Sequence, residues 1–108
     1  MQTMTPGSEI ARFTLLCTPT ADKELTALEN DPRRASRLRA VRKTLGLLEL
    51  DPHDRRLHTH EYQTIQGAKG EKVFASHVDT KAAAVHRVFW HDAPIANHLI
   101  VVAITPYP

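Results

Sequence analysis

Little in the 108-residue chain marks it as a secreted, membrane-spanning or disordered protein. Its single cysteine, Cys17, cannot form an internal disulfide, so a reducing cytoplasm is the expected compartment. No apolar run approaches the ~18 residues of a transmembrane helix, and the longest covers only residues 99–104. No basic start followed by an apolar stretch indicates a signal peptide. The 4 glycines and 7 prolines are ordinary numbers for a chain of this length, which argues against a low-complexity chain.

The charges are nearly balanced overall but unevenly distributed. Lys and Arg total 14 against 12 acidic residues, and a formal net charge of +2 is too small to indicate nucleic-acid binding by itself. However, residues 33–43 contain five arginines and one lysine, whereas the C-terminal third is nearly neutral and holds four of the seven histidines. The sequence therefore predicts a locally positive surface on a nearly neutral molecule.

The length predicts a single domain, because a chain of this size can bury one hydrophobic core but not two. Residues 1–8 combine Thr, Pro, Gly and Ser without a hydrophobic period. We therefore expect a flexible N-terminus over residues 1–8, followed by one domain over residues 9–108. No internal repeat is detectable.

A strand followed by a capped helix is predicted at the beginning of this domain. Between residues 10 and 17, apolar and polar side chains alternate, a pattern typical of a strand with one buried face. Cys17 ends that face and is expected to be a small core residue. Thr18 can cap a helix whose first position is Pro19, since proline is favoured there.

A second helix is predicted by the spacing of its apolar residues. These residues are three, four and three positions apart and so share one face over about three turns: Leu38, Val41, Leu45 and Leu48. Asp31 is expected at the N-cap, with Pro32 at the first helical position. Asp51 and the proline after it are expected to end the helix.

Three strands are predicted in the rest of the chain, at residues 72–78, 84–90 and 99–105, where Val, Ile, Phe and Trp are frequent. The short turn-like segments between them favour antiparallel neighbours, while residues 57–62 are expected to form a loop. The order β-α-α-β-β-β describes an α+β domain in which a helical hairpin packs on one side of a small antiparallel sheet.

Two residues near the C-terminus indicate phosphodiester chemistry. Strand alternation puts Arg87 on the same face as Val85 and Phe89, where its desolvation is costly unless an anion meets it. Two prolines flank Tyr107 and restrict its position. If the last two strands pair, a guanidinium and a phenol converge at one end of the sheet. Arg can stabilise a phosphorane and a phenol can donate a proton to a leaving oxygen.

The element order resembles the RelE/ParE superfamily of bacterial toxins. The resemblance covers roughly residues 10–107 and rests on residues 86–91, HRVFWH, and on the ending 100–108, IVVAITPYP. It implies a toxin of a type II toxin–antitoxin system, a cytoplasmic location and a cognate antitoxin that wraps the helices and sheet. The Trp90 side chain, opposite Arg87, is expected to pack under the helices.

The RNA-cleaving branch of that family implies a metal-free endoribonuclease without cofactors, acting as an mRNA interferase. A ribose 2′-hydroxyl attacks the adjacent phosphate, and ribosome-bound RNA is a possible substrate. By this resemblance Arg87 would hold the scissile phosphate, and Tyr107 would act as an acid or a stacking residue. The branch commonly carries a Glu or Lys base and a second Arg in the second strand. Neither is present at residues 73–77, which leaves Glu71, Lys72 or His77 as candidate bases.

His60 is a further candidate for proton transfer, together with His58, because an unperturbed histidine titrates near neutral pH. Two histidines at this spacing beside Glu61 are also compatible with a zinc site. No cysteine or second close pair completes a tetrahedral set, so no metal is expected. Histidines in a polar surface loop are the simplest interpretation.

The basic residues of the second helix allow three interpretations: a solvated face, phosphate contacts, or a docking surface for an acidic partner segment. The candidates for RNA or partner binding are Arg33, Arg39, Arg42, Lys43 and Lys72. The alternative to an enzyme is a non-catalytic binding module on the same fold, directed at a gyrase-type target or at an antitoxin alone.

Overall fold

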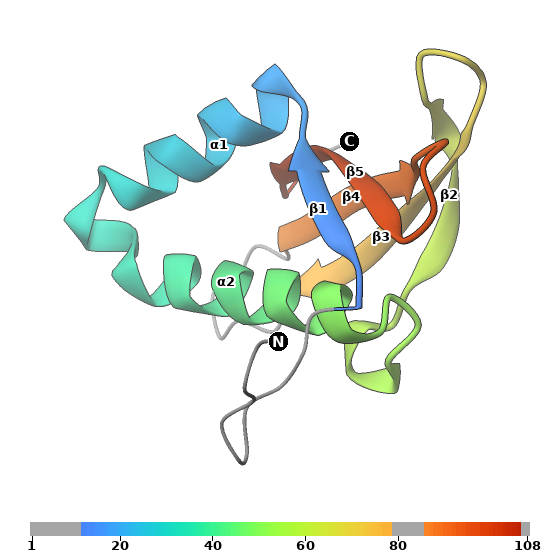
Figure 1. Cartoon of the computed structure of the whole chain (residues 1–108). Helices are drawn as coiled ribbons and strands as arrows, with labels where there is room; N and C mark the ends of the chain where they lie inside the picture. Colours follow the sequence, from blue (N-terminus) through green and yellow to red (C-terminus); the bar gives the residue numbers. More distant parts are fainter. Residues whose placement is uncertain (1–11, 79–85, 107–108) are drawn as a thin grey trace, which may run out of the picture.

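The computed structural model of the protein describes residues 12–78 and 86–106, which form an α+β fold of two helices packed on a five-stranded mixed sheet (Figure 1). The predicted flexible N-terminus, residues 1–8, lies outside these residues. The helices and strands are β1 (Thr14–Cys17), α1 (Pro19–Glu29), α2 (Ala35–Leu50), β2 (His60–Gln66), β3 (Lys72–Val78), β4 (His86–Asp92) and β5 (His98–Thr105). Single 3-10 turns, η1 (Pro32–Arg34) and η2 (Arg55–Leu57), precede α2 and β2.

The sheet has the order β1-β5-β4-β3-β2. Strands β2 to β5 form an antiparallel meander, while β1 runs parallel to β5, with Thr14 opposite His98 and Cys17 opposite Val101. The prediction of an antiparallel sheet is therefore wrong for β1. The prediction of a loop at residues 57–62 is also wrong in part, because β2 begins at His60. As an edge strand with few buried side chains, β2 has only a weak hydrophobic pattern.

The start of α1 is joined directly to β5. The Thr18 hydroxyl accepts a hydrogen bond from the Ala21 amide at 3.2 Å, which confirms the predicted N-cap, and donates to the Val102 carbonyl at 3.1 Å. Further along α1, the Glu24 carboxylate accepts a hydrogen bond from the Ile104 amide at 2.8 Å. The β1 strand pairs with β5 only as far as Val101. Beyond that point, these two bonds satisfy the Val102 carbonyl and the Ile104 amide, and they thereby hold the C-terminal half of β5 in place.

The second helix forms, but it begins at Ala35, because the residues predicted as its first turn form the separate 3-10 turn η1. Asp31 accepts a hydrogen bond from the Arg33 amide at 3.1 Å and so caps η1, which continues into α2. Val41 and Leu48 are completely buried, and the other residues of the predicted apolar stripe pack against the same core. The helix ends at Leu50, before Asp51, as expected.

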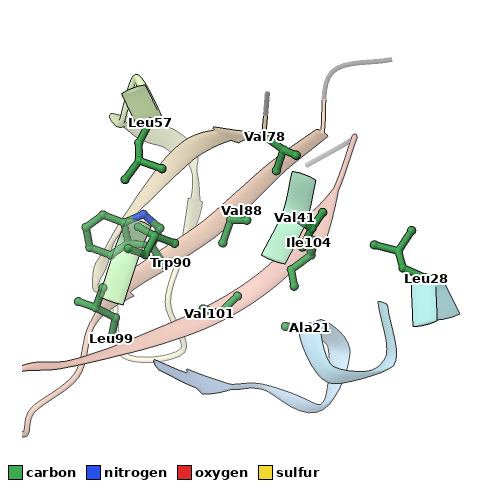
Figure 2. Packing of buried hydrophobic residues seen from close by; sticks show 11 residues of the cluster. Ala21, Leu28, Val41, Leu57, Val78, Val88, Trp90, Leu99, Val101 and Ile104 are labelled. Atoms are coloured by element: carbon green, nitrogen blue, oxygen red, sulfur yellow. The ribbon is translucent and has the colours of Figure 1, made fainter. Parts of the chain in front are cut away.

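The main hydrophobic core lies between the two helices and one face of the sheet (Figure 2). Trp90 is its largest buried side chain and lies between Leu57 and Leu99, which confirms the prediction that it packs under the helices. On the opposite face, Val73, Ala75 and Phe89 form a smaller buried cluster made of sheet residues alone. No helix of residues 12–78 and 86–106 covers that second face.

Cys17 is exposed, and the prediction that it is a core residue is wrong. It lies at the end of β1, an edge strand whose next residue along the chain, Thr18, already begins the helix cap. Burial of part of the thiol and the nearby Asp22 carboxylate raise the pKa of Cys17. The thiol is therefore kept in its protonated, less nucleophilic form.

Candidate active site at one end of the sheet

The candidate site lies on the sheet face away from the helices, where β3, β4 and β5 are in register. His77 of β3 lies opposite Arg87 of β4, and Arg87 lies opposite Thr105 of β5. His77 and Arg87 are each two residues from a member of the small second-face cluster, Ala75 and Phe89, so they share that face. The chain thus places an imidazole beside a guanidinium across two paired strands.

Two further histidines lie around His77. The ring centre of His77 lies 5.8 Å from that of His58 and 5.7 Å from that of His60. His58 and His60 are exposed and His77 is half-buried, so the cluster is accessible to solvent. Nδ1 of His60 also lies 3.2 Å from the His58 carbonyl oxygen, which orients the His60 ring. Three imidazoles are therefore gathered at one point on the surface.

The environment of His77 favours its neutral form. Burial lowers the pKa of His77, and the positive charges of Arg87, His60 and His58 lower it further. A histidine whose pKa lies below its usual 6.5 is deprotonated at neutral pH and can accept a proton. The same positive charges attract an anion, so a proton acceptor and a site for an anion lie next to each other.

Arg87 has an unsatisfied group in this site. Its Nε atom is buried and has no hydrogen-bond partner. The ion pairs found among the described residues join Asp31 to Arg33, Glu29 to Arg42 and Asp54 to Arg56, and Arg87 takes part in none of them. A buried donor without a partner costs about 1–3 kcal/mol. Because this Nε atom is shielded from solvent, an anion reaches it only if the Arg87 side chain shifts.

A buried hydrogen-bond chain holds the histidines in place. The Thr59 hydroxyl lies 2.9 Å from the Pro52 carbonyl oxygen, to which it donates, and 2.7 Å from the Ser76 hydroxyl. Ser76, completely buried in β3, accepts a hydrogen bond from the Trp90 indole at 2.9 Å and donates to Thr59. Each of the three side chains thus has a partner, and the residues on either side of Thr59 are His58 and His60.

The backbone at His58 is also fixed. His58 has a φ of 47°, in the left-handed region, where it ends η2. Residues other than glycine adopt this conformation rarely, and histidine is among those that tolerate it best. This turn and the Thr59 hydrogen bonds direct two successive side chains of the α2–β2 connection toward His77.

The structure brings together some of the predicted site residues and separates others. Arg87, His77 and His60 lie together, whereas Tyr107 lies outside the described residues. Thr105, two residues before Tyr107, pairs with Arg87. Lys72 lies five residues from His77 along β3, which corresponds to about 17 Å at the usual rise of a strand, so it does not reach the site.

The basic residues of η1 and α2 lie on the helix side of the sheet, whereas the site lies on the opposite face. Arg33 and Arg42 form the surface ion pairs with Asp31 and Glu29, and Arg39 is exposed. Lys43 lines a cavity of about 70 Å³ between α2 and the sheet, and His77 and Arg56 lie at the same cavity. Thr59 and Ser76 were not predicted as supporting residues, since isolated hydroxyl residues carry no pattern.

Comparison with known proteins assigns no family to the chain. It shows no significant match to any protein-family profile, curated protein or solved structure. Within residues 12–78 and 86–106, no helix is long and apolar enough to cross a membrane. In the same ranges, no three His, Cys, Asp or Glu side chains are arranged to hold a metal ion.

Proposed function

We propose that this protein is an endoribonuclease with a RelE/ParE-like fold, which cleaves RNA by attack of a ribose 2′-hydroxyl on the adjacent phosphate. The observation that carries this proposal is the position of His77, with His58 and His60 around its ring and Arg87 opposite on the next strand. These residues supply a base, candidate acids and a phosphate ligand. The protein's own side chains therefore suffice for the reaction without a metal ion.

In the proposed reaction, neutral His77 takes the proton of the 2′-hydroxyl, and O2′ forms a bond to phosphorus. The bond from phosphorus to O5′ then breaks, and His60 donates a proton to the leaving O5′. The products are a 2′,3′-cyclic phosphate and a free 5′-hydroxyl. Arg87 stabilises the negative charge that builds up on the non-bridging oxygens, because hydrogen bonds from a guanidinium to charged oxygens are strong.

Tyr107 remains a proposed acid or stacking residue. The support is indirect: β5 reaches Thr105 opposite Arg87, so the chain arrives at the correct end of the sheet. His60 could then orient the leaving group instead of protonating it. A Tyr107→Phe variant separates the two roles, because it removes the phenolic proton and keeps the stacking surface.

The toxin-like assignment is supported by the order of elements, one strand, two helices and then an antiparallel series, in which the last strand ends beside an Arg-containing one. It includes a cytoplasmic location and a cognate antitoxin as partner. We propose the exposed face of α2, with Arg39 and Lys43, as the part of the molecule that an acidic antitoxin segment covers.

The test is cleavage of a labelled single-stranded RNA by the purified full chain in the presence of EDTA. We expect products with a 2′,3′-cyclic phosphate, no cleavage when the 2′-hydroxyls are replaced by hydrogen, and strong loss of cleavage in Arg87→Ala and His77→Ala. Lys69→Ala, in the β2–β3 turn, is the control for the loss of one positive charge. Equal cleavage by wild type and Arg87→Ala would contradict the proposal.

A non-catalytic binding module is the second candidate, favoured by the exposure of Arg39 and Lys43 without an ion pair among the described residues. Expression of the protein in a bacterial host distinguishes the two. Growth arrest with intact RNA, relieved by Arg39→Ala but not by Arg87→Ala, would support the binding module.

A further inference from the structure

A shallow hollow lies beside the histidine cluster, on the connection between α2 and β2. It is wide open to solvent, has a volume of about 720 Å³ and is lined by Asp51, His53, Asp54, Arg55, Arg56 and His58. Ligand sites typically enclose about 300–1,000 Å³, so there is room for a nucleotide. Neither the proposed reaction nor the sequence patterns account for this concentration of polar side chains.

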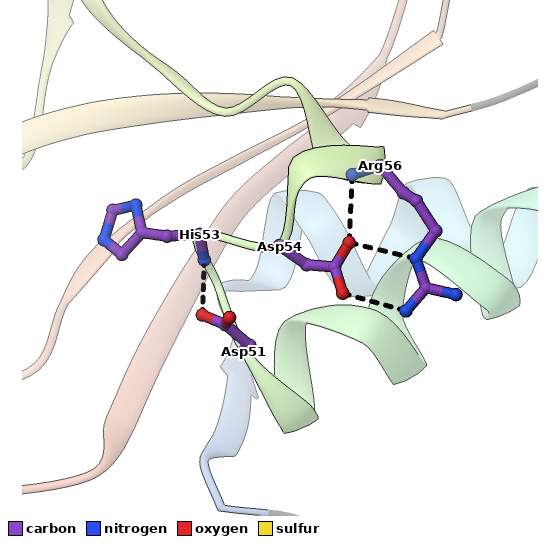
Figure 3. Close-up of polar contacts among 4 residues, drawn as sticks. All are labelled: Asp51, His53, Asp54 and Arg56. Atoms are coloured by element: carbon purple, nitrogen blue, oxygen red, sulfur yellow. Dashed lines mark hydrogen bonds and ion pairs between the residues drawn. The ribbon is translucent and has the colours of Figure 1, made fainter.

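Both carboxylates of the hollow are already bound to the loop itself (Figure 3). Asp54 forms two hydrogen bonds with the Arg56 guanidinium, at 2.8 and 3.0 Å, and accepts a third from the Arg56 amide at 2.9 Å. These bonds, led by the Arg56 side chain, lower the pKa of Asp54 to about 2. Asp51 accepts a hydrogen bond from the His53 amide at 2.9 Å.

Arg55 is the cation that remains available. It is exposed and has no ion pair among the described residues. Asp54 is paired with Arg56 and Asp51 is bonded to a backbone amide, so neither carboxylate holds the Arg55 guanidinium in an ion pair. An exposed guanidinium beside engaged carboxylates is suited to a phosphate, which it can hold by two parallel hydrogen bonds.

His53 adds an aromatic surface to the same hollow. Its ring contacts Phe74 and Trp90 edge-on, with ring centres 6.2 and 6.1 Å apart, yet the residue is exposed. Figure 3 shows the ring pointing away from Asp51 and Asp54. The two aromatic contacts restrict the orientation of the ring, and its free surface can stack against a base, as aromatic side chains do in single-strand binding.

The hollow adjoins the proposed active site at His58. His58 lines the hollow, and its ring centre lies 5.8 Å from that of His77. Arg56 lines both the hollow and the small cavity that includes His77. We propose that the hollow is a second nucleotide subsite, in which Arg55 binds the phosphate next to the scissile one and His53 stacks on its base. This inference rests on the proposed nuclease function and makes an extended single strand of RNA the substrate.

The experiment measures binding separately from cleavage. A fluorescein-labelled hexanucleotide with 2′-O-methyl groups cannot be cleaved, and its affinity for the full chain is measured by fluorescence anisotropy at several salt concentrations. We expect Arg55→Ala to weaken binding about five- to tenfold. The slope of log K against log salt should become shallower by about 0.7, the value for one phosphate contact on a single strand. Lys69→Ala is the matched control and should change neither quantity.

The outcomes separate the two proposals. If wild type cleaves RNA but Arg55→Ala binds the hexanucleotide with unchanged affinity and slope, the second subsite is wrong and the nuclease proposal stands. If the wild type neither cleaves RNA nor binds the hexanucleotide, both are wrong. Replacement of single bases by abasic sites tests the stacking: loss of affinity at one position supports a role for His53, and equal binding at all positions overturns it.

Discussion

His77 and Arg87 lie directly opposite each other on the antiparallel strands β3 and β4, on the sheet face that no described helix covers. Each affects the other: the guanidinium helps to keep the imidazole neutral, and the neutral imidazole adds no repulsion to an anion at the guanidinium. A base and a phosphate ligand are thereby held by the most regular part of the fold.

We expect Arg87→Ala to reduce RNA cleavage by about 10²–10³-fold, the usual effect of removing one donor that stabilises a transition state. Its thermal stability should not fall, because the substitution also removes a buried Nε without a partner. Single-turnover cleavage and thermal melting check the two expectations. Arg87→Lys keeps the charge but not the planar donor geometry, so it should recover only part of the rate.

The pKa of His77 should rise in Arg87→Ala, because Arg87 is the largest charge effect that lowers it. The acid limb of the wild-type cleavage profile should lie below pH 6.5, since activity needs neutral His77 and is lost as the pH falls through its lowered pKa. NMR titration of the His77 imidazole protons measures this pKa in the wild type and in Arg87→Ala, even when cleavage is absent. An unchanged His77 titration in Arg87→Ala would contradict the coupling.

Thr59→Val should destabilise the protein and reduce activity at the same time. The methyl group cannot accept the hydrogen bond of the buried Ser76 hydroxyl or donate to the Pro52 carbonyl, and each unsatisfied buried group costs about 1–3 kcal/mol. Thr59→Ser is the matched control, since it keeps the hydroxyl. If Thr59 positions His58 and His60, kcat should fall more than KM changes, and serine should restore it. Normal kcat in Thr59→Val would contradict this role.

The stability of the protein should decrease between about pH 6.5 and pH 4 because of His86. This residue is buried on the helix side, and burial, with Arg37 and Arg34 nearby, lowers its pKa to about 4. Above pH 6.5 the imidazole is neutral in both states; as the pH falls, only the unfolded chain takes up the proton. The total loss is at most about 3 kcal/mol, at about 1.4 kcal/mol per pKa unit, and solvent screening of the imidazole reduces it. Urea denaturation at several pH values measures it, and His86→Phe should remove this part of the pH dependence.

Local patterns in the sequence were sufficient for most of the elements. The capping hydroxyl of Thr18, the apolar spacing from Leu38 to Leu48 and the strand at residues 72–78 all appear as predicted, because capping and periodicity depend on residues close together in the chain. The last strand begins one residue earlier than predicted, at His98. The α+β class followed from these elements.

The site could be predicted only in part, for a different physical reason. Strand alternation assigned Arg87 and Phe89 to one face, and the structure agrees. The neighbourhood of His58, His60 and His77 depends on the pairing of β2 with β3, and β2 has too few buried residues to be recognised from its pattern. The hydrogen-bond chain through Ser76 likewise joins residues that are far apart in the sequence.

The sequence by itself determined the two helices, the strands other than β2 and the apolar sides of β3 and β4, since these properties arise from steric and hydrogen-bonding preferences within a few residues. Tertiary structure alone decided that β1 runs parallel to β5, that Cys17 is exposed, and that three histidines and Arg87 meet at one end of the sheet. Such contacts depend on the register between distant strands, which is fixed only when the helices and the sheet bury their shared core.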